Sequence, residues 1–262
     1  MKVAVITGAS SGMGREFVVQ LEKYFDIDEV WVIARREDRL KSLQNILKKT
    51  KVKAIPLDLT LKESFDIFHA LLEKEKPDIK LLINASGFGY FGHYENIPMD
   101  YEEKMVDLNV KAYMNMTKLC LPYMHEGSNI IQLDSLSAFQ PVPYIGVYAA
   151  TKAFVLSYSK SLYMELEPRK IRVLSVCPGW VKTEFFETAS KTNDGSVRYF
   201  YKLFEPNDVV AKAYHDLLKT KKEVSVLGFG TRWQVRLVKF LPSKLVMKIW
   251  MRQQRKTKNN NF

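Results

Sequence analysis

Short apolar runs rich in valine and isoleucine alternate along this chain with longer amphipathic stretches. The apolar runs lie at 2–7, 29–34, 51–57, 79–84, 128–134, 171–177 and 223–227. Most of them are almost continuously apolar, as expected for strands that are buried on both faces. The segments with helical periodicity lie at about 12–24, 37–49, 61–75, 100–125, 146–167 and 207–220. Repeated strand–helix–strand units imply right-handed crossovers, so we predict an α/β fold with about seven parallel strands and helices on both faces.

The domain organisation follows from length and composition. The chain has 262 residues, of which 47% are hydrophobic, and this is enough apolar material for one large core. No Pro/Gly/Ser-rich linker, internal repeat or low-complexity tract interrupts the alternating pattern. We therefore predict a single doubly wound domain over residues 1–230, followed by an extension over 231–262. In such sheets ligands bind beyond the carboxyl ends of the strands, so the chemistry is expected there.

A glycine-rich segment, TGASSGMG, ends the first predicted strand and begins the first helix. Gly8 permits a tight turn, Gly12 lets a phosphate approach the backbone, and Gly14 allows close packing of helix and strand. The helix N-terminus offers unpaired N–H groups and a positive dipole end to an anion. A turn without a ligand is the alternative, but the position between strand and helix favours a dinucleotide phosphate site. The predicted contacts there are Gly8, Ser10, Ser11, Gly12, Met13 and Gly14.

The spacing of these glycines resembles that of the short-chain dehydrogenase/reductase family, which has a Rossmann-like sheet. Further motifs occur in the family's order. LDLT and NASG follow the third and fourth strands, and LNV lies on the next helix. A serine after the fifth strand lies thirteen positions before the tyrosine of YAATK, and PGWVKT follows the sixth strand. The resemblance covers about residues 1–227 and implies contacts with a nicotinamide dinucleotide. The residues concerned are Asp58, Leu59, Asn84, Ala85, Gly87, Tyr148, Lys152, Pro178, Gly179, Val181 and Thr183.

The same resemblance assigns catalytic roles to four residues. Tyr148 and Lys152 lie four positions apart, so on a helix they share a face, although this spacing is common on ordinary helix surfaces. Their place among strand-end motifs favours catalysis, with Tyr148 as general acid or base. Lys152 and the positive charge of an oxidised nicotinamide would together lower the pKa of Tyr148. Ser135 would hold the substrate oxygen, and Asn109 would anchor a water that relays protons through Lys152.

Two neighbours compete for these roles, and two residues depart from the family pattern. Ser137 is close to Ser135, but the thirteen-residue interval selects Ser135. Tyr144 has no lysine four positions later, so we expect it to line the pocket. Asp134 stands where the family usually has serine, and Ser86 lengthens the Asn-Ala-Gly element by one small residue. Neither departure removes a catalytic group.

The end of the second strand predicts the choice of dinucleotide. Enzymes that select NAD usually have an acid there for the ribose hydroxyls, whereas this chain has Arg35 and Arg36. Guanidinium groups pair with a 2′-phosphate through charge-assisted hydrogen bonds. Arg15 is a candidate third cation. Two solvated surface arginines are the alternative, and we predict NADP(H) as the cofactor.

Aromatic residues follow three of the predicted strands and indicate a bulky, apolar carbonyl or alcohol as substrate, steroid- or lipid-like in size. Local core packing is the alternative for each of them. We expect residues 184–205 to form a lid over the substrate, as the corresponding region does in the family. The aromatic residues are Phe88, Tyr90, Phe91, Phe139, Tyr144, Trp180, Phe185 and Phe186.

The charge of the chain is concentrated in its C-terminal extension. The net charge is +11, with 40 basic and 29 acidic residues, and nine of the basic residues but none of the acidic ones follow residue 230. The first 230 residues are therefore nearly neutral, and nucleic acid is not the expected partner. The nine residues are Arg232, Arg236, Lys239, Lys244, Lys248, Arg252, Arg255, Lys256 and Lys258.

The extension has amphipathic periodicity on either side of Pro242, which can start a new helix. Its apolar face suits an anionic lipid surface, the domain itself or a second subunit, and these interpretations remain open. No run reaches the roughly 18 apolar residues of a membrane span. We expect a cytoplasmic protein, peripheral at the inner membrane surface under the first interpretation, and a homodimer or homotetramer.

Two broader predictions complete the sequence-based account. Cys120 and Cys177 lie within apolar sequence, which favours buried free thiols over a disulfide or a metal site. The expected activity is NADP(H)-dependent interconversion of a carbonyl and an alcohol. A non-catalytic dinucleotide sensor that acts through its cationic extension is the alternative from another class of protein.

Overall fold

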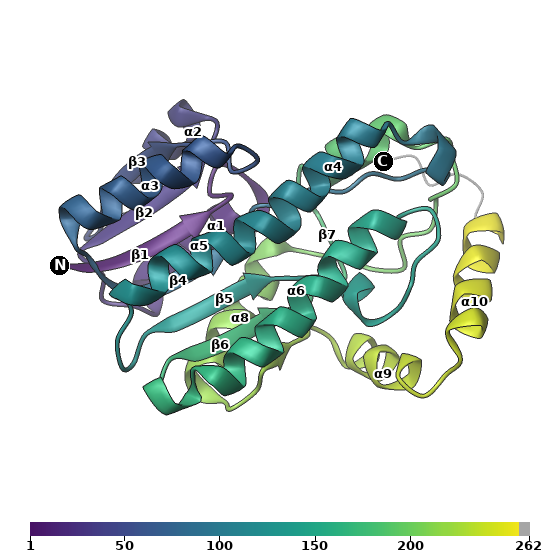
Figure 1. The fold of residues 1–262 in the computed structure, drawn as a ribbon. Coiled ribbons are helices and arrows are strands. Elements are labelled where there is room, and N and C mark those ends of the chain that lie inside the picture. The colour runs from purple at the N-terminus through teal and green to yellow at the C-terminus, as the bar shows by residue number, and fades with distance from the viewer. Residues whose placement is uncertain (257–262) are drawn as a thin grey trace.

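The computed structural model describes residues 1–256, so the last six residues of the predicted extension, 257–262 with Lys258, lie outside the described part. Seven parallel strands form one sheet in the order β3-β2-β1-β4-β5-β6-β9 (Figure 1). The strand order reverses between β1 and β4, and this is where a doubly wound sheet opens its binding crevice. The predicted fold class is confirmed.

The strands agree closely with the apolar runs. They are β1 (Lys2–Thr7), β2 (Glu29–Ala34), β3 (Lys51–Pro56), β4 (Asp78–Asn84), β5 (Asn129–Leu133), β6 (Arg172–Val176) and β9 (Val224–Ser225). Central strands are buried on both faces, as β1 shows: Ala4 and Ile6 pack in one core, and Val3 and Val5 in the other. Side chains alternate between the two faces of a strand, so the continuous apolar run supplies both cores.

The helices form one layer on each side of the sheet (Figure 1). Their bounds are α1 (Gly12–Gln20), α2 (Glu37–Lys41), α3 (Lys62–Glu75), α4 (Met99–Val106), α5 (Ala112–Cys120), α6 (Gly146–Glu165) and α8 (Pro206–Lys219). The second predicted helix is shorter than expected, because 3-10 turns replace the α-helix after Lys41. The predicted 100–125 helix contains a π-helical segment, η4 (Asp107–Lys111), between α4 and α5.

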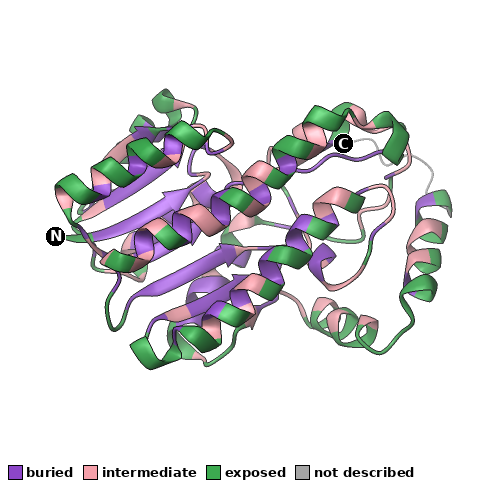
Figure 2. Cartoon of the chain, viewed as in Figure 1, coloured by how far each residue is buried: buried purple, intermediate pink, exposed green. Residues whose placement is uncertain are grey.

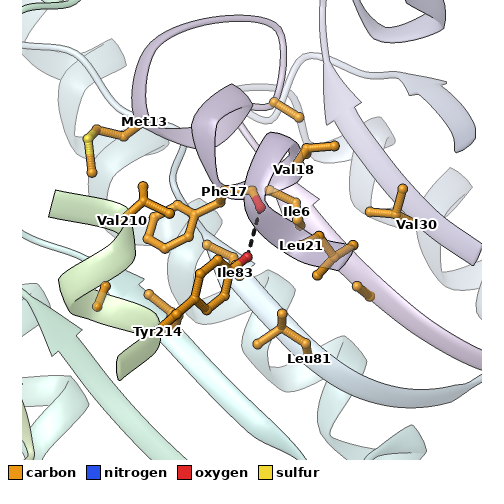
Figure 3. Packing of buried hydrophobic residues seen from close by; sticks show 14 of the residues in the cluster. Ile6, Met13, Phe17, Val18, Leu21, Val30, Leu81, Ile83, Val210 and Tyr214 are labelled. Atoms are coloured by element: carbon orange, nitrogen blue, oxygen red, sulfur yellow. Dashed lines mark hydrogen bonds between the residues drawn. The ribbon is translucent and has the colours of Figure 1, made fainter. Parts of the chain in front are cut away.

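Packing between α1 and α8 anchors one of these layers. Figure 2 shows buried residues along the strands and on the inner faces of the helices. In the close view of Figure 3, the Tyr214 ring lies edge-on to Phe17, with ring centroids 5.4 Å apart. The Tyr214 hydroxyl donates a hydrogen bond of 2.8 Å to the Phe17 carbonyl oxygen. This contact ties α8 to the helix that begins at the glycine-rich turn.

A second, two-stranded sheet lies outside the predictions. It pairs β7 (Trp180–Val181) with β8 (Leu203–Phe204), and α7 (Phe185–Ala189) lies between them in the chain. The pairing closes a loop over residues 182–202, which contains most of the segment 184–205 that we expected to form a lid. These strands have two residues each, too few for a periodic pattern in the sequence.

The extension forms two helices, α9 (Phe229–Val238) and α10 (Ser243–Lys256), and Pro242 precedes the second as expected. Figure 1 shows both at the side toward which the strand arrowheads point. The Trp250 indole donates to the Pro143 carbonyl oxygen at 3.0 Å, and the Gln254 side-chain oxygen accepts from the Arg198 and Tyr199 amides at 2.8 Å each. One face of α10 therefore packs on the domain itself.

Other apolar side chains of α9, α10 and the turn between them are partly or largely exposed. Within the described residues, no helix is long and apolar enough to cross a membrane. Cys120 and Cys177 are buried free thiols, which confirms their expected burial. The exposed large side chains are Phe229, Trp233, Leu237, Phe240, Leu241, Leu245 and Ile249.

Candidate active site

A cavity of about 1240 Å³ opens at the carboxyl ends of the strands. It extends from the glycine-rich turn, past Ser135 and Tyr148, to the side chains of Trp233 and Trp250 in the extension. Its size exceeds that of an ordinary small-molecule pocket, so it has room for a dinucleotide and a substrate together. The expected meeting of strand-end motifs at one edge of the sheet is therefore present in the structure.

The glycine-rich turn has the shape of a phosphate cradle. Gly8 has a φ of +68°, and a Cβ atom there would lie 2.7 Å from the Ala85 carbonyl oxygen. Gly14 approaches still more closely, since its Cβ would lie 2.3 Å from the Gly8 oxygen. Ser11 precedes α1 and makes no side-chain capping bond, so the first amides of the helix are not capped by it. These residues fit the diphosphate of a dinucleotide, whose charge complements the helix dipole.

Two arginines of the predicted cofactor site point in different directions. Arg36 donates hydrogen bonds to Ser11 (2.9 Å) and Ser10 (3.2 Å) in the glycine-rich turn. Arg35 is largely exposed and lies 3.9 Å from the Asp58 carboxylate. The second cation beside Arg36 is Arg39, because both arginines pair with Glu184. Arg15, our candidate third cation, is not among the described residues that line the cavity.

The proposed catalytic side chains come from two elements that pack together. Ser135 follows β5, and Tyr148 and Lys152 lie in the first part of α6. The Lys152 ammonium is buried, donates to the Leu133 carbonyl oxygen at 2.8 Å and lies 5.8 Å from the centre of the Tyr148 ring. The Tyr148 hydroxyl shares a hydrogen bond with the Ser135 side chain. The structure thus brings all three groups together at the cavity wall.

Asn109 lies behind this wall, within the π-helical segment. Its side chain is fully buried, and it accepts from the Phe88 amide at 3.1 Å and donates to the Phe88 carbonyl oxygen at 2.8 Å. It also donates to the Thr151 hydroxyl at 3.1 Å. A π-helical turn often marks a functional position because it redirects one side chain. Here that side chain joins the loop after β4 to α6, next to Lys152.

Burial dominates the ionisation of the site. Burial raises the pKa of Tyr148, while the hydrogen bond with Ser135 lowers it and the Asp134 carboxylate raises it. Burial lowers the pKa of Lys152, and Asp134 raises it again. The net effect of the protein groups is to raise the pKa of Tyr148, chiefly through burial. The lowering expected from Lys152 together with an oxidised nicotinamide stays a prediction. A phenol that keeps its proton suits a general acid.

Asp134 is buried beneath these groups and links them electrostatically. Its carboxylate accepts from the Ser135 amide at 2.8 Å and from the Ser175 hydroxyl at 3.1 Å. Burial raises the pKa of Asp134, and the Lys152 charge lowers it. Asp134, which stands where the family usually has serine, is therefore a third titrating group beside Tyr148 and Lys152.

We expect Asp134→Asn to move the pH–rate profile to lower pH by roughly half a unit to one unit. Asparagine keeps the acceptor but removes the charge that raises the pKa of both Tyr148 and Lys152, so both values fall. Initial rates measured from pH 5 to 10 test this. Asp66→Asn, on the exposed face of α3, is the matched control and should leave the profile in place. An unmoved profile in Asp134→Asn would mean that Asp134 is protonated throughout this range.

Several predicted positions are corrected by the structure. The Asn84 side chain does not line the cavity; it is buried and donates to Thr117 of α5 and Gln132 of β5, because it points from the end of β4 toward these two elements. Phe91, Tyr144 and Phe139 do not line the cavity, so their expected place in its wall is wrong; Phe91 and Tyr144 pack behind Trp180 and Phe185 in one apolar cluster, and Phe139 packs in another. Of the predicted aromatic wall, the cavity is lined by Phe88, Tyr90, Trp180, Phe185 and Phe186.

Four neighbouring residues were missed from the sequence. Tyr113 on α5 donates to the same Leu133 carbonyl oxygen as Lys152, and its ring lies 5.1 Å from the ammonium. A Cβ on Gly89 would lie 2.8 Å from the Tyr148 ring, so a glycine at this position leaves room for that ring. Glu184 and Arg39 meet across the cofactor site. Of these four residues, only Arg39 could have been predicted from the sequence. It lies three positions after Arg36 at the start of a helix, so the two side chains share a face.

A doubly wound sheet with a glycine-rich first turn and a Ser–Tyr–Lys group defines a dinucleotide-dependent oxidoreductase. The family model described as "short chain dehydrogenase" matches residues 2–194. The chain therefore belongs to the short-chain dehydrogenase/reductase family. An uncharacterized oxidoreductase of Staphylococcus aureus (strain MRSA252) is 29% identical over 222 residues, which is 84% of this chain and 92% of the relative.

Solved structures share the fold over nearly the whole chain. A short-chain dehydrogenase from Sphingobium yanoikuyae in complex with NADPH has a TM-score of 0.77 and 24% identity, and the match covers 100% of this chain and 98% of that one. A 3-ketoacyl-(acyl-carrier-protein) reductase from Brucella melitensis complexed with NADH has a TM-score of 0.71 and 26% identity, with 86% and 95% covered. Nicotinamide dinucleotides thus occur in both similar structures, as NADPH in one and NADH in the other.

Proposed function

We propose that this protein is an NADP(H)-dependent reductase of bulky, apolar carbonyl compounds, with the corresponding alcohol dehydrogenation as the reverse reaction. The observation that carries this proposal is the placement of Ser135, Tyr148 and Lys152 on one cavity that also contains the glycine-rich turn and Arg36. A phenol hydrogen-bonded to a serine and adjacent to a buried ammonium suits proton transfer to a substrate oxygen.

Each catalytic side chain has a proposed task. The bound nicotinamide supplies or accepts the hydride. Ser135 donates a hydrogen bond to the carbonyl oxygen and holds it near Tyr148. Tyr148 then gives its proton to that oxygen as negative charge develops, and burial supports this role by keeping the phenol protonated. Lys152 stabilises the phenolate that remains, while Asn109 fixes the Phe88 loop against α6.

The preference for NADP(H) rests on the charges beside the glycine-rich turn. The Arg36 guanidinium lies between Ser10 and Ser11, where a ribose 2′-phosphate has cationic and hydroxyl partners within reach. Arg39 adds a second guanidinium to the same region. Asp58 faces Arg35 rather than Arg36, so it does not occupy this place. A 2′-phosphate gains charge-assisted hydrogen bonds here that a ribose hydroxyl lacks.

The substrate class rests on the other half of the cavity. Phe185 lies 5.4 Å from Tyr148, ring centre to ring centre, and Trp180 and Phe186 continue the wall. The extension completes it, since Leu237, Val246 and Trp250 line the same cavity. An apolar wall of this extent suits a steroid-sized or lipid-derived ketone, because burial of apolar area supplies the binding free energy.

A panel of aromatic, steroid and long-chain ketones, followed by NADPH absorbance, tests the function. We expect bulky apolar ketones to be reduced with a kcat/KM at least about tenfold above that for acetone-sized ones, since their extra carbons are buried in the cavity. We also expect NADPH to exceed NADH by about 10- to 100-fold, as charge-assisted hydrogen bonds to the 2′-phosphate predict. No turnover across the panel, with NADPH still bound, would favour the dinucleotide sensor.

We further propose that the extension contacts an anionic membrane surface. Phe229 at the start of α9 and Phe240 between α9 and α10 are exposed among the cations of the extension, and Phe240 is 86% exposed. No cation between 231 and 255 forms an ion pair with another residue of the described chain. Anionic headgroups complement these charges, and the apolar side chains would enter the acyl boundary beside the cavity.

Vesicle co-sedimentation of the full chain tests this contact. We expect binding to phosphatidylglycerol vesicles but not to phosphatidylcholine vesicles, and a loss of about tenfold or more in the double variant Phe229→Ser, Phe240→Ser. Ile67→Ser, which changes an exposed apolar residue on α3, is the control. Equal pelleting with both lipids, or with neither, would contradict the proposal.

A homodimer or homotetramer remains our proposal for the assembly. Light scattering measures the mass of the assembly in solution.

A further inference from the structure

Glu184 is an acidic residue placed directly against the cations of the proposed 2′-phosphate site. One carboxylate oxygen lies 2.9 Å from an Arg36 nitrogen, and the other pairs with Arg39. All three side chains are 37–44% exposed, so the cluster lies at the cavity mouth rather than in the core. Arg36 and Glu184 both line the cavity.

The contacts of Arg36 show why this carboxylate bears on the cofactor. Nη2 and Nε of Arg36 face Ser10 and Ser11, and Nη1 faces Glu184. A 2′-phosphate bound beside Ser10 and Ser11 would bring a second anion to the same guanidinium. Two anions that share one cation repel each other at this distance, so they compete for it. The pKa of Glu184 is lowered by both arginines, so the carboxylate is ionised at neutral pH.

The chain position of Glu184 links this competition to the substrate wall. It directly precedes α7, and the next residue, Phe185, packs against Tyr148. Thr183, on its other side, lies 3.3 Å from the position of a Cβ on Gly12. The segment that carries Glu184 therefore lies across the cavity from the glycine-rich turn to the catalytic tyrosine.

We propose that Glu184 is a specificity-determining residue that acts as an internal competitor of the 2′-phosphate. Its carboxylate holds Arg36 and Arg39 until a 2′-phosphate displaces it, and this frees the start of α7. A dinucleotide without the 2′-phosphate leaves the Glu184 pairs in place. This inference rests on the proposed preference for NADP(H). Glu184 would weaken that preference, and it would couple binding of the 2′-phosphate to the substrate wall.

Binding of 2′,5′-ADP and of 5′-ADP, measured by calorimetry on the full chain, tests the proposal without any turnover. We expect Glu184→Gln to bind 2′,5′-ADP about three- to tenfold more tightly than the unmutated protein, since two half-exposed ion pairs no longer have to be broken. Its affinity for 5′-ADP should change less than about twofold, because that ligand does not need Arg36. High salt should reduce the difference.

Glu187→Gln is the matched control, since Glu187 is exposed on α7 and contributes only a longer-range charge effect on Arg39. It should leave 2′,5′-ADP affinity nearly unchanged, whereas an equal gain would assign the effect to net charge and overturn the proposal. Unchanged or weaker binding of 2′,5′-ADP by Glu184→Gln would also overturn the proposal. Weaker binding would mean that Glu184 positions the arginines for the phosphate. If 2′,5′-ADP binds no better than 5′-ADP to the unmutated protein, the NADP(H) preference itself is wrong and the inference falls with it.

Hydrogen exchange gives a second, independent measurement. Saturating 2′,5′-ADP should speed exchange of the α7 amides in the unmutated protein, because displacement of Glu184 releases the start of that helix. In Glu184→Gln the exchange should already be fast without ligand. Slower exchange on 2′,5′-ADP binding to the unmutated protein would show that α7 closes on the phosphate, which contradicts displacement.

Discussion

Tyr148→Phe should lower kcat for ketone reduction by about 10²–10⁴-fold while NADPH affinity stays within about twofold. The phenol is the proposed proton donor to the substrate oxygen, and phenylalanine keeps the ring that Lys152 and Phe185 contact. Loss of the hydroxyl therefore removes proton transfer and the hydrogen bond with Ser135, but leaves the cavity wall. Steady-state rates and quenching of protein fluorescence by NADPH measure the two quantities separately.

Tyr144→Phe is the matched control for this experiment. Tyr144 lies four residues earlier, outside the cavity wall, and its ring packs on His93. Its hydroxyl has no place in the proposed reaction, so kcat should stay within about twofold of the unmutated value. A Tyr148→Phe protein with nearly full turnover would end the proposed mechanism. A loss of NADPH binding in step with turnover would instead assign Tyr148 to the cofactor site.

Gly14→Ala should destabilise the fold by about 3 kcal/mol and abolish NADPH binding. A Cβ atom at this position would lie 2.3 Å from the Gly8 carbonyl oxygen and 2.6 Å from its carbon. Both are backbone atoms, which cannot move away by a side-chain rotation, so α1 would have to shift from the turn. Denaturant titration gives the free energy of unfolding, and the melting temperature should fall by about 6–12 °C.

The control for this substitution is Gly146→Ala, at the first residue of α6. No atom lies within 4 Å of the added Cβ there, and alanine is the better helix former. Its free energy of unfolding should equal or exceed that of the unmutated protein by up to about 1 kcal/mol. If Gly14→Ala were as stable as Gly146→Ala and still bound NADPH, the close contact between α1 and the turn would not constrain this fold.

Most of the fold was predictable because its signals are local and repeated. The seven apolar runs correspond to the seven strands, since strands buried on both faces need side chains of the same kind in succession. The helix ends were less accurate: after Lys41 the chain continues in 3-10 turns. The β7–β8 pair was missed because its two segments are far apart in sequence and too short for a pattern.

The site was predictable where residue type and strand-end position suffice. Ser135, Tyr148 and Lys152 were found in this way, and the structure places them on one cavity. Asn84 was misplaced because a motif gives the order of residues but not the direction of each side chain. The rise in the pKa of Tyr148 that burial causes could not be predicted either, since the cost of burial depends on every neighbour of the phenol.

Residue order along the chain was enough to specify a doubly wound sheet, a glycine-rich first turn between strand and helix, and a Tyr–Lys pair on one helix. These features depend on interactions within a few residues, or on a period that repeats from end to end. The folded chain alone revealed that α10 packs over the cavity through Trp250, and that Glu184 meets Arg36 across 148 positions of sequence. Contacts at such separations depend on how whole elements pack, and no local pattern of residues records that arrangement.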